Sequence, residues 1–158
     1  MTIRIALALP LAAFVLAGGS AVAQQAEVKM EGGCEKLVIA GQDVTQACEK
    51  TLVNTVAGTR TTFDFGASDG QTLSFSGTGA QQEGTEATEP LQPINLVVAG
   101  RKNSDGIVRN PAPAVGSCRF SSPERGKTRI ECEATSQGKV YAGVFVTAAG
   151  GTPGAGKP

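Results

Sequence analysis

Four cysteines in two equally spaced pairs constrain the fold of this chain more than any other feature. Thirteen residues separate Cys34 from Cys48, and thirteen separate Cys118 from Cys132. In an exported protein, such close pairs predict two local disulfides, Cys34–Cys48 and Cys118–Cys132. Each is worth about 3 kcal/mol in the chain-entropy model, because it restricts the unfolded chain. The spacing therefore predicts two locally cross-linked units.

The first 23 residues have the pattern of a secretory signal. Arg4 precedes an apolar run from Ile5 to about Leu16, and Ala21-Val22-Ala23 is a small-residue cleavage site. The apolar run is too short to span a membrane. We expect residues 1–23 to be removed on export. The remaining 135 of the 158 residues should form a periplasmic or secreted protein without a membrane anchor.

The spacing of turn-forming residues in the mature chain is typical of an all-β protein. Short apolar or alternating runs are separated by Gly, Asp-Gly and Pro at close intervals. The pattern predicts one small antiparallel sandwich or barrel of about seven or eight strands over residues 34–147. Residues 24–33 are polar and are expected to be a flexible lead-in. The Gly- and Pro-rich residues 148–158 are expected to be a disordered tail.

The clearest hairpin covers residues 60–77, with a turn at residues 68–70. Apolar side chains alternate along both arms, so four of them are expected on one buried face: Phe63, Phe65, Leu73 and Phe75. The acidic stretch 77–90 has no large apolar residue and predicts a long exposed loop.

Further along the chain, two strands and one connector are expected. Residues 91–100 predict a strand with Pro93 near its start or on an edge. Residues 110–116 predict a rigid extended connector. Residues 140–147 predict a central strand, because apolar residues point to both faces.

The second cysteine pair predicts a strand register. If Cys118 and Cys132 oppose each other in an antiparallel pair, Phe120 opposes Ile130 on the cysteine face. Arg119 then opposes Glu131 on the other face. An apolar pair beside a disulfide and an opposite-charge pair on the solvent side are favourable cross-strand combinations.

The first cysteine pair leaves two alternatives open. An equivalent hairpin would pair Val38 with Val44, but it also places Lys36 and Gln46 on that face. The alternative is one short helix near residues 44–57, with Asp43 as its N-cap. The β-branched residues of this segment favour a strand.

The sequence carries no recognisable catalytic, cofactor-binding or metal-binding motif. It has no histidine, which removes the usual general base and the commonest zinc ligand. Paired cysteines leave no thiol. Glu131 and Glu133 share a strand face with Arg129, which predicts a solvated ion-paired surface. Asp64 and Asp69 are explained by strand alternation and by turn chemistry.

These features predict an exported, non-catalytic binding or structural module of the cell envelope, acting through loops such as 77–90. The expected partner is a protein or an envelope polysaccharide. Export and the lack of a basic stripe argue against nucleic acid.

The alternative function is inhibition of a hydrolase such as a lysozyme or a protease. The chain resembles small disulfide-bearing β-barrel inhibitors of lysozyme in size and compartment. Ser76-Gly77 is similar to part of their Ser-Gly loop motif. The tyrosine of that motif is missing, with Ala80 and Gln81 nearby instead, so no site residue is transferred.

Overall fold

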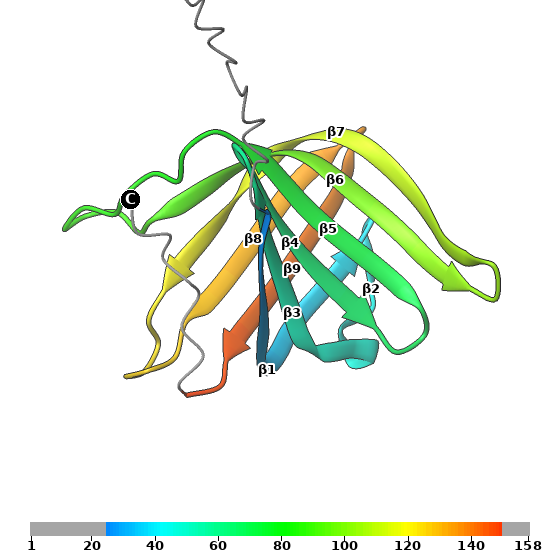
Figure 1. Ribbon diagram of the computed structural model, residues 1–158, viewed down its shortest axis with the longest axis horizontal. Coiled ribbons are helices and arrows are strands. Elements are labelled where there is room, and N and C mark those ends of the chain that lie inside the picture. Colours follow the sequence, from blue (N-terminus) through cyan, green and yellow to red (C-terminus); the bar gives the residue numbers. More distant parts are fainter. Residues whose placement is uncertain (1–24, 150–158) are drawn as a thin grey trace, which may run out of the picture.

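The chain folds into a closed antiparallel β-barrel, described here from a computed structural model over residues 25–149 (Figure 1). Eight strands form the barrel and a two-residue strand, β2, extends the pairing of β1. The strands are β1 (Gln25–Ile39), β2 (Gln42–Asp43), β3 (Cys48–Ala57), β4 (Arg60–Ala67), β5 (Gln71–Thr78), β6 (Leu91–Asn103), β7 (Gly106–Ser121), β8 (Arg129–Ser136) and β9 (Lys139–Thr147). β1 pairs with β9 and closes the barrel. The all-β prediction, including a small barrel, is confirmed.

The barrel is an up-and-down meander, because each strand from β3 to β9 pairs with the next one along the chain. Two-residue turns at Gly58-Thr59 and Gln137-Gly138 connect β3 to β4 and β8 to β9. Gly58, Gln137 and Gly138 all have positive φ, which is the backbone geometry that tight hairpins need.

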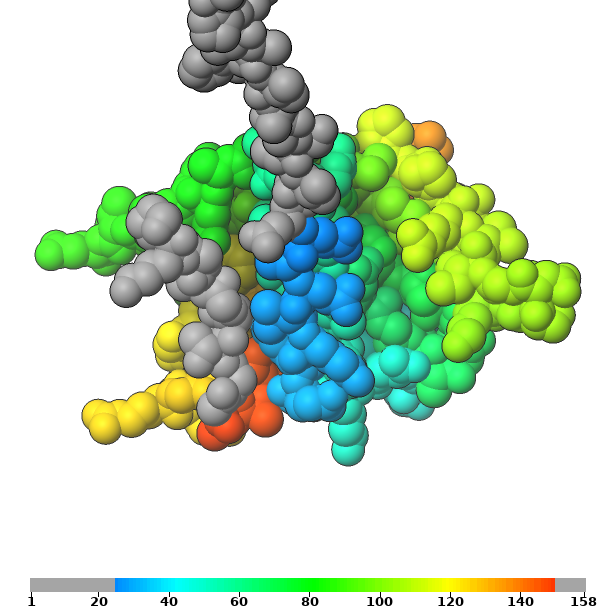
Figure 2. Space-filling model, in the orientation of Figure 1, coloured from blue at the N-terminus to red at the C-terminus, as the bar shows by residue number. Residues whose placement is uncertain are grey.

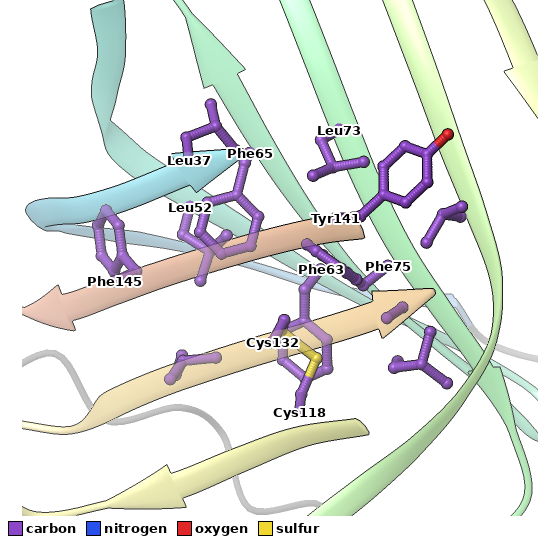
Figure 3. Packing of buried hydrophobic residues seen from close by; sticks show 14 of the residues in the cluster. Leu37, Leu52, Phe63, Phe65, Leu73, Phe75, Cys118, Cys132, Tyr141 and Phe145 are labelled. Carbon is purple, nitrogen blue, oxygen red and sulfur yellow. A yellow bond between two sulfur atoms is a disulfide. The ribbon is translucent and has the colours of Figure 1, made fainter. Parts of the chain in front are cut away.

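The barrel interior is a packed apolar core (Figure 3). Phe63 pairs with Phe75, and Phe65 with Leu73, across β4 and β5. All four side chains are buried, so the predicted hairpin and its buried face are confirmed. Phe65 and Phe75 meet edge to face, with ring centroids 5.8 Å apart, a favoured aromatic geometry.

The second disulfide lies inside the barrel in the predicted register. Cys118 pairs with Cys132, Phe120 with Ile130, and Arg119 with Glu131. Both cysteines are fully buried and lie close to Phe63 in Figure 3.

On the outer face of this unit, Glu131 forms its ion pair within β8. Among the described residues, no ion pair joins Arg119 to Glu131. The Glu131 carboxylate instead lies 3.4 Å from Arg129, which also binds Glu35.

The first disulfide, Cys34–Cys48, joins β1 to the start of β3. The predicted pairing of Val38 with Val44 is wrong, because a tight Ala40-Gly41 turn pairs Val38 with Asp43 instead. The helix near residues 44–57 is also wrong beyond one short 3-10 turn, Thr45–Ala47. The remainder is strand β3, as the β-branched composition favoured.

Residues 24–33, expected to be a flexible lead-in, are instead part of the barrel from Gln25 onward. Gln25 to Glu31 pair with Ala57 to Thr51 of β3. The pairing partners of β1 then change: Gly32 begins the ladder with β9. Polar side chains are compatible with this strand because most of them point to solvent.

The segment 110–116, expected to be a connector, belongs to the 16-residue strand β7. Asn110 to Pro113 pair with Ala99 to Leu96 of β6. The strands predicted over 91–100 and 140–147 are confirmed as β6 and β9, and Pro93 lies near the start of β6.

The predicted signal peptide, residues 1–23, lies outside the described residues, as does all but the start of the predicted tail 148–158. In residues 25–149, no helix is long and apolar enough to span a membrane.

Candidate functional site

One end of the barrel opens into a pocket of about 580 Å³, which we call the mouth pocket. It is lined by the ends of β3, β4, β6 and β7, by the β3–β4 turn, by Thr128 and by the start of the β5–β6 loop. An eight-stranded barrel is wide enough to hold one small ligand, and barrel mouths are common binding sites.

The apolar wall of the mouth pocket consists of Val56, Phe63 and Phe120. The Phe63 and Phe120 rings lie 5.7 Å apart at their centroids and are tilted by 48°. Phe63 is 4% exposed and continues into the core, whereas Phe120 is only half-buried and Val56 is 38% exposed. The packed core therefore ends at Phe63, and the space above it is open.

Two amide side chains supply polar groups to the mouth pocket. Gln92 is 2% exposed, and its Nε2 atom donates to the carbonyl oxygens of Pro93 at 3.2 Å and Gly79 at 3.5 Å. Asn54 Nδ2 donates to the Thr62 carbonyl oxygen at 3.1 Å. Because both amide nitrogens are held by the backbone, the two side chains have fixed orientations. Their carbonyl oxygens remain as acceptors.

The β5–β6 loop, residues 79–90, forms the rim of the mouth pocket. Its beginning is tied to the barrel, because Gly79 N donates to the Thr59 carbonyl oxygen at 3.0 Å. Gln82 and Leu91 exchange two backbone hydrogen bonds. The rest of the loop extends away from the barrel (green at the left of Figure 1). The exposed loop predicted at residues 77–90 is confirmed from Gly79 onward, whereas Gly77 and Thr78 lie in β5.

Acidic side chains fall into two groups in the structure. Glu131 and Glu133 lie on the outer face of β8, where Glu131 binds Arg129, as the sequence predicted. Asp69 accepts hydrogen bonds from Gln71 Nε2 at 2.7 Å and from the backbone N–H of Gln71 at 3.0 Å, and both lower the pKa of this turn carboxyl.

Asp64 differs from these carboxyls because it is partly withdrawn from water. It lies half-buried on the outer face of β4 and accepts a hydrogen bond from the Ser74 hydroxyl. Desolvation raises its pKa above the ordinary value of 3.8. In the described part of the chain, no Lys or Arg lies within ion-pair distance of it.

Three further residues, Tyr141, Ser76 and Gly77, lie within the barrel strands. Tyr141 is 7% exposed and packs in the core, with its hydroxyl directed away from the labelled phenylalanines in Figure 3. Ser76 and Gly77 lie in β5, not in a loop, and Ser76 is 3% exposed. They do not form the loop motif of the lysozyme inhibitors.

No family model, curated protein or solved structure matches this chain. Both predicted disulfides are present, and no cysteine is free. Two disulfides are consistent with an oxidising compartment.

The sequence anticipated the rim of the mouth pocket but not its walls. Asn54, Gln92 and Phe120 come from three strands far apart in the sequence. Polar residues at inward-facing strand positions, Asn54 and Gln92, are the sequence signal from which this pocket could have been predicted.

Proposed function

We propose that this chain is an exported, non-catalytic binding module that holds a small, mostly apolar molecule in the mouth pocket. The observation that supports the proposal best is the unfilled 580 Å³ space between the packed core and the β5–β6 loop. This volume falls within the usual range for small-molecule sites, about 300–1,000 Å³.

The lining suggests the chemistry of the ligand. Val56, Phe63 and Phe120 offer apolar contact, and the Asn54 and Gln92 carbonyl oxygens can accept hydrogen bonds. Glu83 is the one charged residue among those that line the pocket. These groups fit a neutral, largely apolar molecule with a few hydrogen-bond donors.

Export and a non-catalytic role are supported by the sequence. The signal pattern of residues 1–23 and the two disulfides agree with action in the periplasm or outside the cell. The chain has no histidine, and its four cysteines are all paired.

The proposal can be tested with the neutral fluorescent probe N-phenyl-1-naphthylamine. We expect the mature protein to bind it with increased fluorescence. Ala80→Trp, at the rim of the mouth pocket, should weaken binding at least about tenfold by filling the entrance. Val115→Trp is the matched control, because Val115 is 83% exposed and does not line the pocket. Equal binding by both variants would refute the mouth pocket as the site.

A second candidate function is inhibition of a hydrolase through the β5–β6 loop. The observation that favours it is the exposed loop at the barrel rim, stabilised internally by a 2.8 Å hydrogen bond between the hydroxyls of Thr85 and Thr88. The mature protein should then slow a lysozyme or a protease at equimolar concentration. Replacing residues 83–88 with a Gly-Ser linker should abolish the effect, and full activity of every enzyme tested would refute this function.

A further inference from the structure

A second concavity, of about 610 Å³, lies on the outer face of the barrel over β3 to β7. We call it the outer groove. In Figure 2 it lies between the blue start of β1 and the yellow-green β6–β7 hairpin. Its position is separate from the mouth pocket, and the two share no lining residue.

Cross-strand pairing places small side chains side by side on the floor of the outer groove. One row runs from Val53 through Asp64 and Ser74 to Val98. The next runs in the same order of strands through Thr55, Thr62, Ser76 and Leu96.

A third row runs beside these two at the edge of the groove. Gly66 pairs with Thr72, and Thr72 with Gly100, so Thr72 carries the one side chain at these three positions. A methyl group on Gly100 would lie 2.4 Å from Thr72 Oγ1. The Glu49 carboxylate lies over Gly66, where an added methyl group would be 2.7 Å from it, and Arg109 also lines the groove.

The polar groups of the outer groove have no net charge. Asp64 and Glu49 are balanced by Arg60 and Arg109. Ser and Thr side chains stand between them in the rows described above. Ser76 is buried, whereas four others are half-buried and can both donate and accept hydrogen bonds: Thr55, Thr62, Thr72 and Ser74. This combination offers little attraction to an ion but many partners to a neutral ligand rich in hydroxyls.

Part of this polar surface is held in place before any ligand binds. Arg60 Nη1 donates to Ser76 Oγ at 2.9 Å, and Ser76 Oγ lies 3.0 Å from Thr62 Oγ1. Ser76 is only 3% exposed, so these contacts are shielded from water. The Arg60 guanidinium is therefore oriented, and its remaining N–H groups are available as donors.

Asp64 lies at the centre of the floor with spare hydrogen-bonding capacity. Ser74 supplies its one side-chain hydrogen bond among the described residues. A carboxylate has two oxygens and about four acceptor positions. Two neighbouring hydroxyls of a sugar ring can therefore donate to it together, which would compensate for its partial desolvation.

From this arrangement we propose that the outer groove binds a neutral saccharide chain, with Asp64 as the central acceptor and Arg60 and Arg109 as donors. The small floor side chains admit a ring lying flat on the sheet. Val53 and Val98, on either side of Asp64 and Ser74, provide contact for its C–H groups. This site does not depend on the mouth pocket.

The test is an NMR titration of the mature protein with neutral hexasaccharides of glucose, mannose and N-acetylglucosamine. We expect at least one of them to shift the amide signals of residues in the three rows, at concentrations up to about 10 mM. Asp64→Asn should weaken that binding at least about tenfold, because a hydrogen-bonded charged acceptor is lost.

Glu133→Gln is the matched control, because it removes a carboxylate from the outer face of β8, away from the groove. It should bind like the unaltered protein, and the folding of both variants can be compared from their NMR spectra. The proposal is overturned if no hexasaccharide shifts these signals, if Asp64→Asn binds as tightly as the unaltered protein, or if a charged peptide binds the groove more tightly than every saccharide.

Discussion

At the scale of single residues, Gly143 shows how closely opposite walls of the barrel approach. Gly143 belongs to β9, and a methyl group at this position would lie 2.6 Å from the Phe65 ring of β4. Real Cβ atoms do not approach a ring so closely, so Phe65 or the core around it would have to shift to admit the methyl group. Phe65 is 2% exposed, so it has no free space to move into.

Gly143→Ala should therefore lower the free energy of unfolding by about 1–3 kcal/mol, the usual cost of overpacking. Gly33→Ala is the control, because a methyl group there has no neighbour within 4 Å and should change stability by less than about 0.5 kcal/mol. Urea denaturation of the two variants measures the difference. Equal stability would show that the core yields to the added methyl group.

Asp64 should also make stability depend on pH, with a sign set by its raised pKa. Desolvation favours the protonated form in the folded state. As pH rises through the ordinary value of 3.8, the unfolded chain loses this proton first, and the folded state loses stability until the folded carboxyl has also ionised.

Asp64→Asn removes this penalty, so it should be more stable than the unaltered protein at neutral pH. The difference between the two free energies of unfolding should shrink toward acidic pH, where Asp64 is protonated in both states. Denaturation curves from about pH 3 to pH 7 measure it. A difference that does not vary with pH would contradict the desolvation of Asp64.

At the scale of elements, β7 shows how the barrel protects an open strand edge. Its residues 106–114 pair with β6, but pairing with β8 begins only at Val115. Lys102 of β6 donates its N–H to Gly70, on the side away from β7. By the alternation of an antiparallel ladder, the nitrogens of Pro111 and Pro113 face away from β6, toward the open edge. Two prolines therefore remove two donors from that edge.

Restoring those donors should promote association between edges. We expect the double variant Pro111→Thr, Pro113→Thr to form oligomers or aggregates at concentrations where the unaltered protein is monodisperse. Pro123→Thr, in the exposed β7–β8 connection, is the control. Size-exclusion chromatography with light scattering measures the effect, and identical profiles for all three proteins would refute the protective role of the two prolines.

The strand pairing next to the first disulfide lies outside the two cysteines, whereas the predicted hairpin lay between them. Opposed residues of β1 and β3 follow the same register as the pair Cys34 and Cys48, but the ladder runs outward from Glu31–Thr51 to Gln25–Ala57. The predicted hairpin placed the ladder between the two cysteines, with Val38 opposite Val44. Ala26, Val28 and Met30 alternate with polar residues over this half of β1, and Met30 is buried with Val28 packed against the core. This short alternation was therefore a local signal for the strand that the sequence hypothesis missed.

At the scale of the whole molecule, β1 closes the barrel by pairing with two different strands. Residues 25–31 pair with β3, and residues 32–38 pair with β9. The closed sheet removes most strand edges, and it completes the interior that buries the core.

Deleting residues 25–31 should therefore abolish cooperative unfolding, because one edge of β3 loses its partner strand. Deleting residues 84–88 from the exposed β5–β6 loop should leave the transition cooperative, since loop length has a small energetic effect. Thermal unfolding followed by circular dichroism distinguishes them. A sharp transition in the first deletion would mean that closure needs only the contacts between β1 and β9.

The local features of this protein were determined by the sequence alone. The cysteine spacing predicted both disulfides, and the register around Cys118–Cys132 followed from the residues beside it. The alternation of Phe63, Phe65, Leu73 and Phe75 predicted a buried hairpin face. Each of these depends on residues that are near one another in the chain, where side-chain period and turn chemistry decide the outcome.

Only the tertiary structure decided the features that require distant strands to meet. These include the choice of a closed barrel over a sandwich and the pairing of β1 with β9. The mouth pocket and the outer groove belong with them, since each combines strands from across the sheet. The physical reason is that closure depends on the accumulated twist of all eight strands and on contacts such as Gly143 against Phe65, which no local pattern contains.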